Sequence, residues 1–261
     1  MYETIILNVE NRVATITLNR PKSGNAFIPK SYEEIRQALD TCAQNDEVGS
    51  IVLTGAGKHF SAGGDIQRFK RLIETKEYLI KGSILEAGKM ALAVRRCPKP
   101  VIAMINGAAA GAGAGLALAC DFRIMEPKSK LAMSFINMGL SGDTCTMFSC
   151  LRLLGTAKAM ELMMTGDLIT GEEALQIGLA TILTKQDQLE QETYAYAQKM
   201  ANRPLYAIAR QKEILLEFFY SNMDVYTKRE AECMVECSHT ADFEEAVNAF
   251  LEKRPPQFIG K

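Results

Sequence analysis

The sequence predicts an α/β protein with a parallel sheet in its core and helices in its last third. Two β-branched apolar runs, at 50–55 (SIVLTG) and 100–105 (PVIAMI), are typical of buried parallel strands. Glycine-rich stretches follow them at 59–66 (HFSAGGDI) and 105–121 (INGAAAGAGAGLALACD), and the second continues as an Ala- and Leu-rich helix. This alternation of strands and helices favours a parallel α/β arrangement.

The N-terminal part of the chain predicts its elements one after another. Residues 2–9 and 12–18 alternate between apolar and polar side chains, so we expect a hairpin that turns at Glu10–Asn11. Residues 28–44 have apolar side chains at helical spacing and predict an amphipathic helix. Residues 67–96 are charged at first and then helical, and we expect them to select the substrate.

The C-terminal part changes character. One more strand is expected at 122–126 (FRIME), and from about Thr156 nearly every segment has the pattern of a helix. No linker rich in Ser, Pro or Gly separates these helices from the rest. We therefore expect a core at 1–183 and a helical region at 184–261, with a soft boundary between them.

The composition excludes several classes of protein. Thirty basic and 31 acidic side chains give a net charge of −1, which argues against nucleic acid or an anionic membrane as a principal partner. The longest apolar runs are interrupted before they could span a membrane. Seven scattered cysteines without a CxxC pair, in a chain that shows no secretory leader, indicate free thiols in a reducing compartment. We expect a soluble, cytoplasmic protein without a metal site.

The two glycine-rich stretches suggest a common chemistry. A strand, a tight turn and a helix start leave backbone N–H groups unpaired at the positive end of a helix dipole. Two such turns can direct two N–H donors at one oxygen atom and so form an oxyanion hole. Each stretch alone could equally be an ordinary tight turn.

Several motifs occur in an order that resembles the crotonase (enoyl-CoA hydratase/isomerase) superfamily over essentially the whole chain. They are VATITLNRPKSGNAF, SAGGD, INGAAAGAGAG, TGDLITGEEALQIGL and ADFEEAVNAFLEKRPPQF. The resemblance implies a ββα spiral core, C-terminal helices that assemble a homotrimer or homohexamer, and an acyl-CoA thioester substrate. It also implies that the amides of Gly64 and Ala112 bind the thioester oxygen.

The resemblance further implies which residues would carry protons. Enoyl-CoA hydratases of this superfamily activate water with two glutamates, and the matching positions here are Gly115 and Phe135. Asp143 matches an aspartate found in some isomerases, and the pattern is most similar to the 1,2-epoxyphenylacetyl-CoA isomerase subgroup. Two departures from that subgroup, Gly142 for proline and Cys145–Thr146 for Gly-Gly, put the ring substrate in doubt.

A single carboxylate suffices for an isomerase, because it can remove a proton at one carbon and return it at another. Apolar neighbours would disfavour the ionised form of Asp143 and raise its proton affinity toward the useful range. The neighbours expected from the sequence are Met133, Phe135, Met138 and Phe148. Asp143 could instead cap the helix that follows it.

The resemblance also suggests contacts to the coenzyme A portion of the substrate. Basic side chains would meet its phosphates, with Lys22, Arg68 and Lys261 as the candidates. The other candidate binding residues are Ala26, Ala62, Asp65, Ile66 and Phe258. The backbone of Ala26, Ala62 and Ile66 would contact the adenine and pantetheine. Asp65 would hydrogen-bond its own turn, and Phe258 would cover the adenine. Coenzyme A is part of the substrate, so no further cofactor is expected.

The sequence thus predicts an acyl-CoA isomerase that shifts a double bond or rearranges a ring-derived acyl group. Two alternatives stay open. An enoyl-CoA hydratase would need a water-activating residue that the pattern lacks, and a non-catalytic acyl-CoA-binding protein would bind without turnover. A thioester hydrolase or decarboxylase would use the same oxyanion hole.

Overall fold

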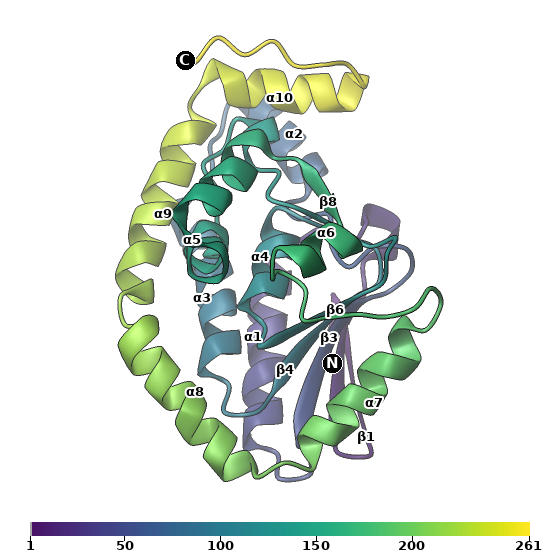
Figure 1. The fold of residues 1–261 in the computed structure, drawn as a ribbon. Coiled ribbons are helices and arrows are strands. Elements are labelled where there is room, and N and C mark those ends of the chain that lie inside the picture. The colour runs from purple at the N-terminus through teal and green to yellow at the C-terminus, as the bar shows by residue number, and fades with distance from the viewer. Residues whose placement is uncertain (1) are drawn as a thin grey trace.

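The computed structural model describes residues 2–261, and its centre is a six-stranded sheet (Figure 1). The strands, in their order across the sheet, are β1 (Ile5–Glu10), β2 (Val13–Leu18), β3 (Ser50–Gly55), β4 (Val101–Ile105), β6 (Phe122–Met125) and β9 (Ile182–Leu183). β1 and β2 form an antiparallel hairpin, and every other neighbouring pair is parallel. The predicted α/β class is confirmed.

A second sheet of three short strands lies next to the first. It consists of β5 (Ala108–Ala110), β7 (Lys130–Ala132) and β8 (Leu168–Thr170), with β7 in the middle. A further bridge pairs Ser61 with Ala109, so the first glycine-rich stretch runs beside β5. This sheet joins the two stretches that the sequence singled out.

Ten α-helices surround the sheets in the described part of the chain. They are α1 (Pro29–Gln44), α2 (Ile66–Thr75), α3 (Lys81–Arg96), α4 (Ala112–Ala119), α5 (Thr146–Thr165), α6 (Gly171–Gln176), α7 (Leu189–Ala201), α8 (Leu205–Phe219), α9 (Met223–Ser238) and α10 (Ala241–Glu252). Short 3₁₀ turns, η1 (Pro21–Ser23) and η2 (Ile136–Met138), add to these. α5 is interrupted at Gly155, whose backbone is not helical.

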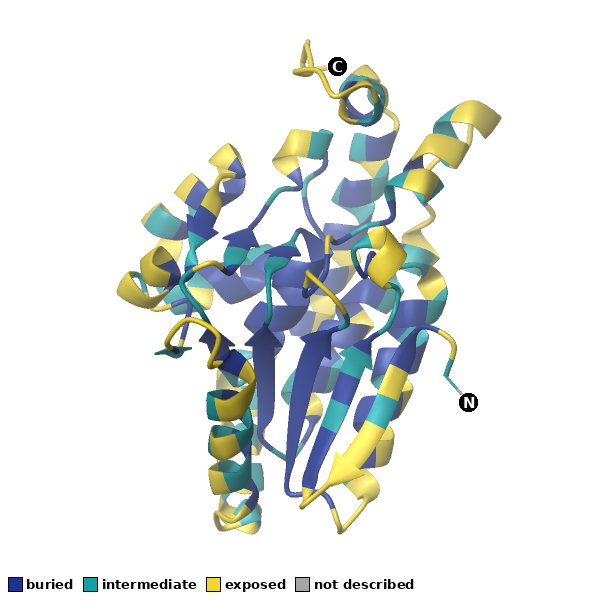
Figure 2. Cartoon of the chain, turned by 90° about the vertical axis from the view of Figure 1, so that its right-hand side faces the viewer, coloured by how far each residue is buried: buried dark blue, intermediate teal, exposed yellow. Residues whose placement is uncertain are grey.

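The larger sheet is covered on both faces, which explains its continuous apolar runs. On one side α1 and α3 pack together, and on the other α7 packs against β2, β3, β4 and β6. Val52, Ile102 and Ile124 contact the apolar side of α7 through Leu189 and Ala197. Figure 2 shows the buried central strands in dark blue and a largely exposed outer strand.

Most element predictions are confirmed. The hairpin, the helix at 28–44, the strands at 50–55, 100–105 and 122–126, and the Ala- and Leu-rich helix all form close to the expected limits. The last third is helical as expected except for β8 and β9. Within the chain, α9 packs against α3. The division at residue 183 and the expected oligomer stay predictions.

All seven cysteines are unpaired. Five of them are buried, and the remaining two, Cys233 and Cys237, are half-buried on α9. Burial raises the pKa of the Cys42 thiol to about 11 and those of Cys120 and Cys150 to about 12. In residues 2–261, no helix combines the length and the apolar character that crossing a membrane requires.

Candidate active site

The two glycine-rich turns lie side by side. The Ala110 N–H donates to the Ser61 carbonyl at 2.9 Å, and the Ser61 N–H donates to the Ala108 carbonyl at 3.1 Å. Gly63 has a φ of +87°, and a Cβ there would lie 2.6 Å from the Ala110 carbonyl oxygen and 3.3 Å from the Ala112 nitrogen. Only glycine allows this close approach of two backbones.

The proposed oxyanion donors sit at the ends of these turns. Gly64 lines a cavity beside the turns, and Ala112 is the first residue of α4, where a helical N–H has no intrahelical acceptor. In residues 2–261 neither N–H donates to another protein group. The arrangement is the one that an oxyanion hole requires, and the assignment of the two donors stays a prediction.

The cavity has a volume of about 690 Å³ and is mostly apolar. Phe69, Phe135, Met138, Leu140 and Met234 are among its lining residues. The acidic residues among those that line it are Asp65 and Asp143. An apolar cleft with few polar groups is typical of a small-molecule site, so the two carboxylates are its candidates for chemistry.

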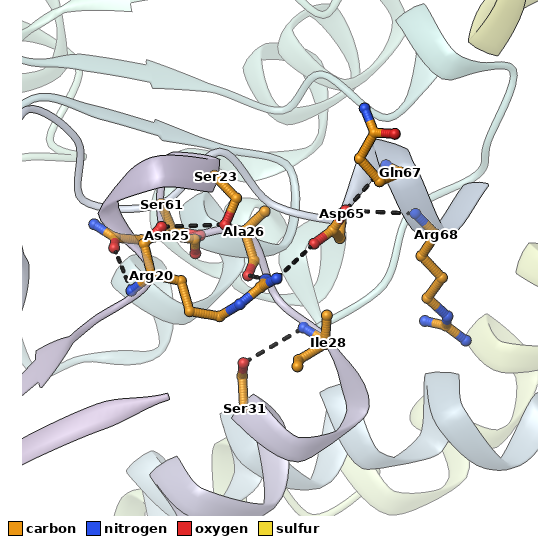
Figure 3. A network of polar contacts seen from close by, with 10 residues as sticks. All are labelled: Arg20, Ser23, Asn25, Ala26, Ile28, Ser31, Ser61, Asp65, Gln67 and Arg68. Atoms are coloured by element: carbon orange, nitrogen blue, oxygen red, sulfur yellow. Dashed lines mark hydrogen bonds and ion pairs between the residues drawn. The ribbon is translucent and has the colours of Figure 1, made fainter. Parts of the chain in front are cut away.

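Asp65 is engaged in holding its own turn, as the sequence suggested (Figure 3). Its carboxylate accepts from the backbone N–H of Gln67 at 3.0 Å and of Arg68 at 3.4 Å, and so caps α2. Its other oxygen pairs with the Arg20 guanidinium at 2.9 Å. Arg20 also donates to the carbonyl of Ala26. Asp65 therefore fixes the first turn and is poorly suited to carry protons.

Asp143 is buried at the cavity wall, with only 5% of its surface exposed. Burial raises the pKa of its carboxyl to about 6, although the Thr144 hydroxyl and the Arg68 guanidinium act in the opposite direction. The Thr144 hydroxyl donates to Asp143 Oδ1 at 2.8 Å. A carboxyl with this pKa exchanges protons readily near neutral pH.

The helix-cap alternative for Asp143 is wrong. α5 begins at Thr146, its N-cap residue is Cys145, and no side chain of that cap accepts a hydrogen bond. The Asp143 carbonyl, rather than its carboxylate, accepts from Thr146, through the backbone N–H at 3.0 Å and the hydroxyl at 2.8 Å. The carboxylate is thus left to face the cavity.

The two positions that match the hydratase glutamates hold no carboxylate. A Cβ on Gly115 would lie 2.8 Å from the Thr144 Cβ and in contact with the Thr146 hydroxyl, so a longer side chain does not fit there. Phe135 is one of the residues that line the cavity. The turn that carries Asp143 therefore occupies the space next to α4 that a glutamate would need.

The remaining candidates fall into two groups. Lys22, Ala26, Ala62 and Ile66 line the cavity together with Gly64. The others lie elsewhere in residues 2–261. The Arg68 guanidinium donates to the Ser83 hydroxyl of α3 at 2.9 Å. Phe258 and Lys261 belong to an exposed tail beside α10, and the carbonyl of Lys261 accepts from Asp242 at 3.2 Å. Among the expected apolar neighbours of Asp143, Met133 and Phe148 are buried but are absent from the cavity lining.

Sequence reasoning missed the contribution of the C-terminal helices. Met234 of α9 and Phe250 of α10 line the cavity, and Glu230 of α9 is buried one turn before Met234. The buried residues Thr227, Glu230 and Met234 recur at helical spacing. This spacing could have predicted from the sequence that the Glu230 carboxylate lies on the inner face of α9.

The model of the enoyl-CoA hydratase/isomerase family matches residues 8–261. Similar proteins include a trans-2-decenoyl-[acyl-carrier-protein] isomerase from Streptococcus mutans, 34% identical over 100% of this chain and 99% of its own length. A 1,2-epoxyphenylacetyl-CoA isomerase from Escherichia coli is 32% identical over 100% of both chains. A crotonyl-CoA hydratase from Syntrophomonas wolfei is 32% identical over 100% of this chain and 99% of its own length.

Solved structures agree with this result. An enoyl-CoA hydratase from Mycobacterium avium subsp. paratuberculosis superposes with a TM-score of 0.89 at 26% identity, covering 99% of this chain and 100% of the other. The names of these relatives include both hydratases and isomerases. The matching family model, together with relatives that are similar over the full chain, shows that this protein belongs to the enoyl-CoA hydratase/isomerase family of the crotonase superfamily.

Proposed function

We propose that the protein is an acyl-thioester isomerase that uses Asp143 as its single proton carrier. The N–H groups of Gly64 and Ala112 bind the thioester oxygen and stabilise the enolate that forms when a proton leaves the neighbouring carbon. A 3-enoyl thioester loses a proton from C2 to Asp143, the electrons delocalise into a dienolate, and the Asp143 carboxyl, which exchanges its proton with solvent, returns a proton at C4. The product is the 2-enoyl thioester, and neither water nor a redox cofactor takes part.

One observation carries the preference for isomerisation over hydration. The place of one hydratase glutamate is filled by Thr144 and Thr146 against Gly115, and the place of the other is the Phe135 ring. Asp65 is already held by Arg20 and by the start of α2. Asp143 is therefore the acidic group left to exchange a proton, and a second carboxylate to hold water is missing from the cavity lining of residues 2–261.

The substrate class follows from the cavity and the relatives. The mostly apolar lining of the cavity suits an acyl chain, and Lys22 at the same cavity suits an anionic carrier such as coenzyme A. The name of the Streptococcus mutans relative extends the proposal to a carrier-protein thioester, and that of the Escherichia coli relative to a ring-derived acyl group. We also propose a cytoplasmic homotrimer or homohexamer.

The test follows 3-decenoyl-CoA and trans-2-decenoyl-CoA in deuterated water by mass spectrometry, and repeats both with the acyl carrier protein thioesters. We expect interconversion of the two isomers with deuterium uptake and without a hydrated product. Asp143→Asn should lower kcat by about 10²- to 10⁴-fold, the usual contribution of a general base, with little change in substrate binding. Asp167→Asn is the matched control, because Asp167 is exposed and does not line the cavity.

Two results would contradict the proposal. Formation of 3-hydroxyacyl-CoA at a rate that Asp143→Asn leaves unchanged would identify a hydratase with a different water site. Tight binding of these thioesters and of ring-derived acyl-CoA esters without any deuterium uptake would identify a binding protein.

A further inference from the structure

Glu230 is a second buried carboxyl group beside the site, and the proposed chemistry does not use it. It lies on the inner face of α9, one turn before the cavity residue Met234. Its Oε2 accepts a hydrogen bond from the backbone N–H of Cys145 at 2.9 Å. Buried carboxylates are rare unless they serve a partner, and here the partner is the turn that carries Asp143.

That turn has an unusual backbone. Gly142 has a φ of +113°, and the next residues after Asp143 continue in the left-handed region, with φ of +57° at Thr144 and +53° at Cys145. Left-handed conformations are unfavourable for residues with a side chain, especially a β-branched one. Such a conformation persists only where the surroundings impose it.

Most hydrogen bonds of the turn are local and would move with it. The Thr144 hydroxyl reaches Asp143, and Thr146 reaches the Asp143 carbonyl. The bond from the Cys145 N–H to Glu230 differs, because it ties the backbone of the left-handed pair to another helix. The Cys145 Sγ also lies 3.4 Å from the Thr227 Oγ1 of that helix, a weaker side-chain contact. α9 in turn packs against α3, which makes it a firm support.

We propose that Glu230 is a positioning residue that anchors the strained Thr144–Cys145 turn to α9 and thereby keeps the Asp143 carboxyl directed into the cavity. The inference rests on the proposed role of Asp143 as the proton carrier. Without the anchor, the turn relaxes toward ordinary backbone angles and Asp143 leaves its place above the substrate.

The charge on Glu230 is not what matters at neutral pH. Burial raises the pKa of Glu230 to about 8, with the charge of Asp143 adding to the effect and the Cys145 N–H and Tyr226 hydroxyl opposing it. From α3, Arg95 acts on the neighbouring Cys145 thiol. Near pH 7 the Glu230 carboxyl is therefore mostly protonated and neutral. The oxygen that does not carry the proton accepts the hydrogen bond from the Cys145 N–H. A glutamine preserves this acceptor and its neutrality.

Two variants of equal length separate the anchor from simple packing. Glu230→Met keeps an apolar chain of similar size and removes the strong acceptor, so kcat should fall about tenfold to a hundredfold, as for a misplaced catalytic group. KM should stay within about twofold, because substrate binding does not use Glu230. Glu230→Gln should retain kcat within about threefold of the wild type. Glu236→Gln, an exposed position on the same helix, is the control.

A second measurement does not depend on activity. Aspartate labelled with ¹³C at the carboxyl carbon reports the pKa of Asp143, identified as the signal that Asp143→Asn lacks. We expect a pKa near 6 in the wild type and in Glu230→Gln, and a lower pKa in Glu230→Met because water reaches the displaced carboxyl.

The outcomes separate this inference from the proposed function. A Glu230→Met protein with unchanged kcat and an unchanged pKa of Asp143 overturns the anchor and leaves the isomerase intact. Equal damage by Glu230→Gln and Glu230→Met also overturns it. A wild-type protein that isomerises no thioester ends the proposed function, while the titration of Asp143 still decides whether Glu230 holds the turn.

Discussion

The two glycine-rich turns, which carry Gly64 and Ala112, and the turn that carries Asp143 meet at one cavity but are held in different ways. The Gly64 and Ala112 turns are fixed by backbone pairing, through the Ser61–Ala109 bridge and the start of α4. In residues 2–261 the Asp143 turn pairs with no strand, and it depends on close packing against Gly115 of α4 and on side chains of α5 and α9. The proposed oxyanion donors are therefore fixed by the fold itself, whereas the position of the proposed base depends on packing.

This contrast has a consequence for sequence change. Backbone donors survive most substitutions because every residue except proline supplies an N–H. A carboxylate on a strained turn moves out of position when one of the residues that hold the turn is replaced by a residue of different shape. Substitution of side chains can therefore change the proposed proton carrier and leave the proposed oxyanion hole in place. The following variants probe the two sides of this contrast.

Ala112→Pro changes the backbone-held region and should have a larger effect than the two changes in stability that follow. Proline is tolerated at the first position of a helix, so α4 should persist while the Ala112 N–H disappears. Loss of one oxyanion donor lowers kcat by about 10²- to 10³-fold. Steady-state kinetics give the loss, and circular dichroism checks the helix. Activity near the wild-type level would show that Ala112 is not a donor.

Asp143→Asn changes the region that depends on side chains, and its effect is measured as a change in the free energy of unfolding. Because burial raises the pKa of Asp143 to about 6, the folded state prefers the protonated carboxyl. This preference contributes stability below about pH 4, the ordinary range of an aspartate, and is lost as the pH rises through 6. The amide cannot ionise, so above pH 6 the variant should be more stable than the wild type by up to about 3 kcal/mol.

Urea unfolding between pH 4 and pH 8 measures this difference. The stabilisation by Asp143→Asn should grow as the pH rises from 4 to 7 and then level off. A difference that stays constant across this range would mean that the carboxyl is not desolvated in the folded protein.

Gly115→Ala attacks the contact between the two regions and should have the smallest effect. The added Cβ lies 2.8 Å from the Thr144 Cβ, so the Asp143 turn has to shift. Overpacking of this kind costs about 1–3 kcal/mol of unfolding free energy. Gly82→Ala in α3 is the control, because its Cβ enters open space and should stabilise by about 0.4–1 kcal/mol. Equal melting temperatures for the two variants would contradict the tight contact.

The sequence predicted elements and turns where the information is local. Apolar periodicity predicts the longer strands and the long helices, and composition predicts the glycine-rich turns. The strands β5, β7 and β8 have three residues each, and β9 has two, which is too short for a periodic pattern. Their pairing is decided by tertiary contacts.

The site shows the same limit. Asp143 could be placed by its motif, but the left-handed Thr144 and Cys145 beside it are imposed by contacts that no local pattern encodes. Glu230 lies 85 residues after the N–H that it accepts, so only the packing of α9 reveals the partnership. The Arg68 guanidinium, expected at a phosphate, reaches Ser83 because the start of α3 lies within its range.

The distribution of cysteines gives the molecule its own reporter. The five buried thiols are shielded, and burial raises the pKa of Cys42, Cys120 and Cys150 far above neutrality, so they form little thiolate. Cys233 and Cys237 are half-buried and one turn apart on α9, the helix that carries Glu230. A maleimide dye added to the unmodified protein should therefore mark α9 first, and its fluorescence would follow that helix while substrate enters.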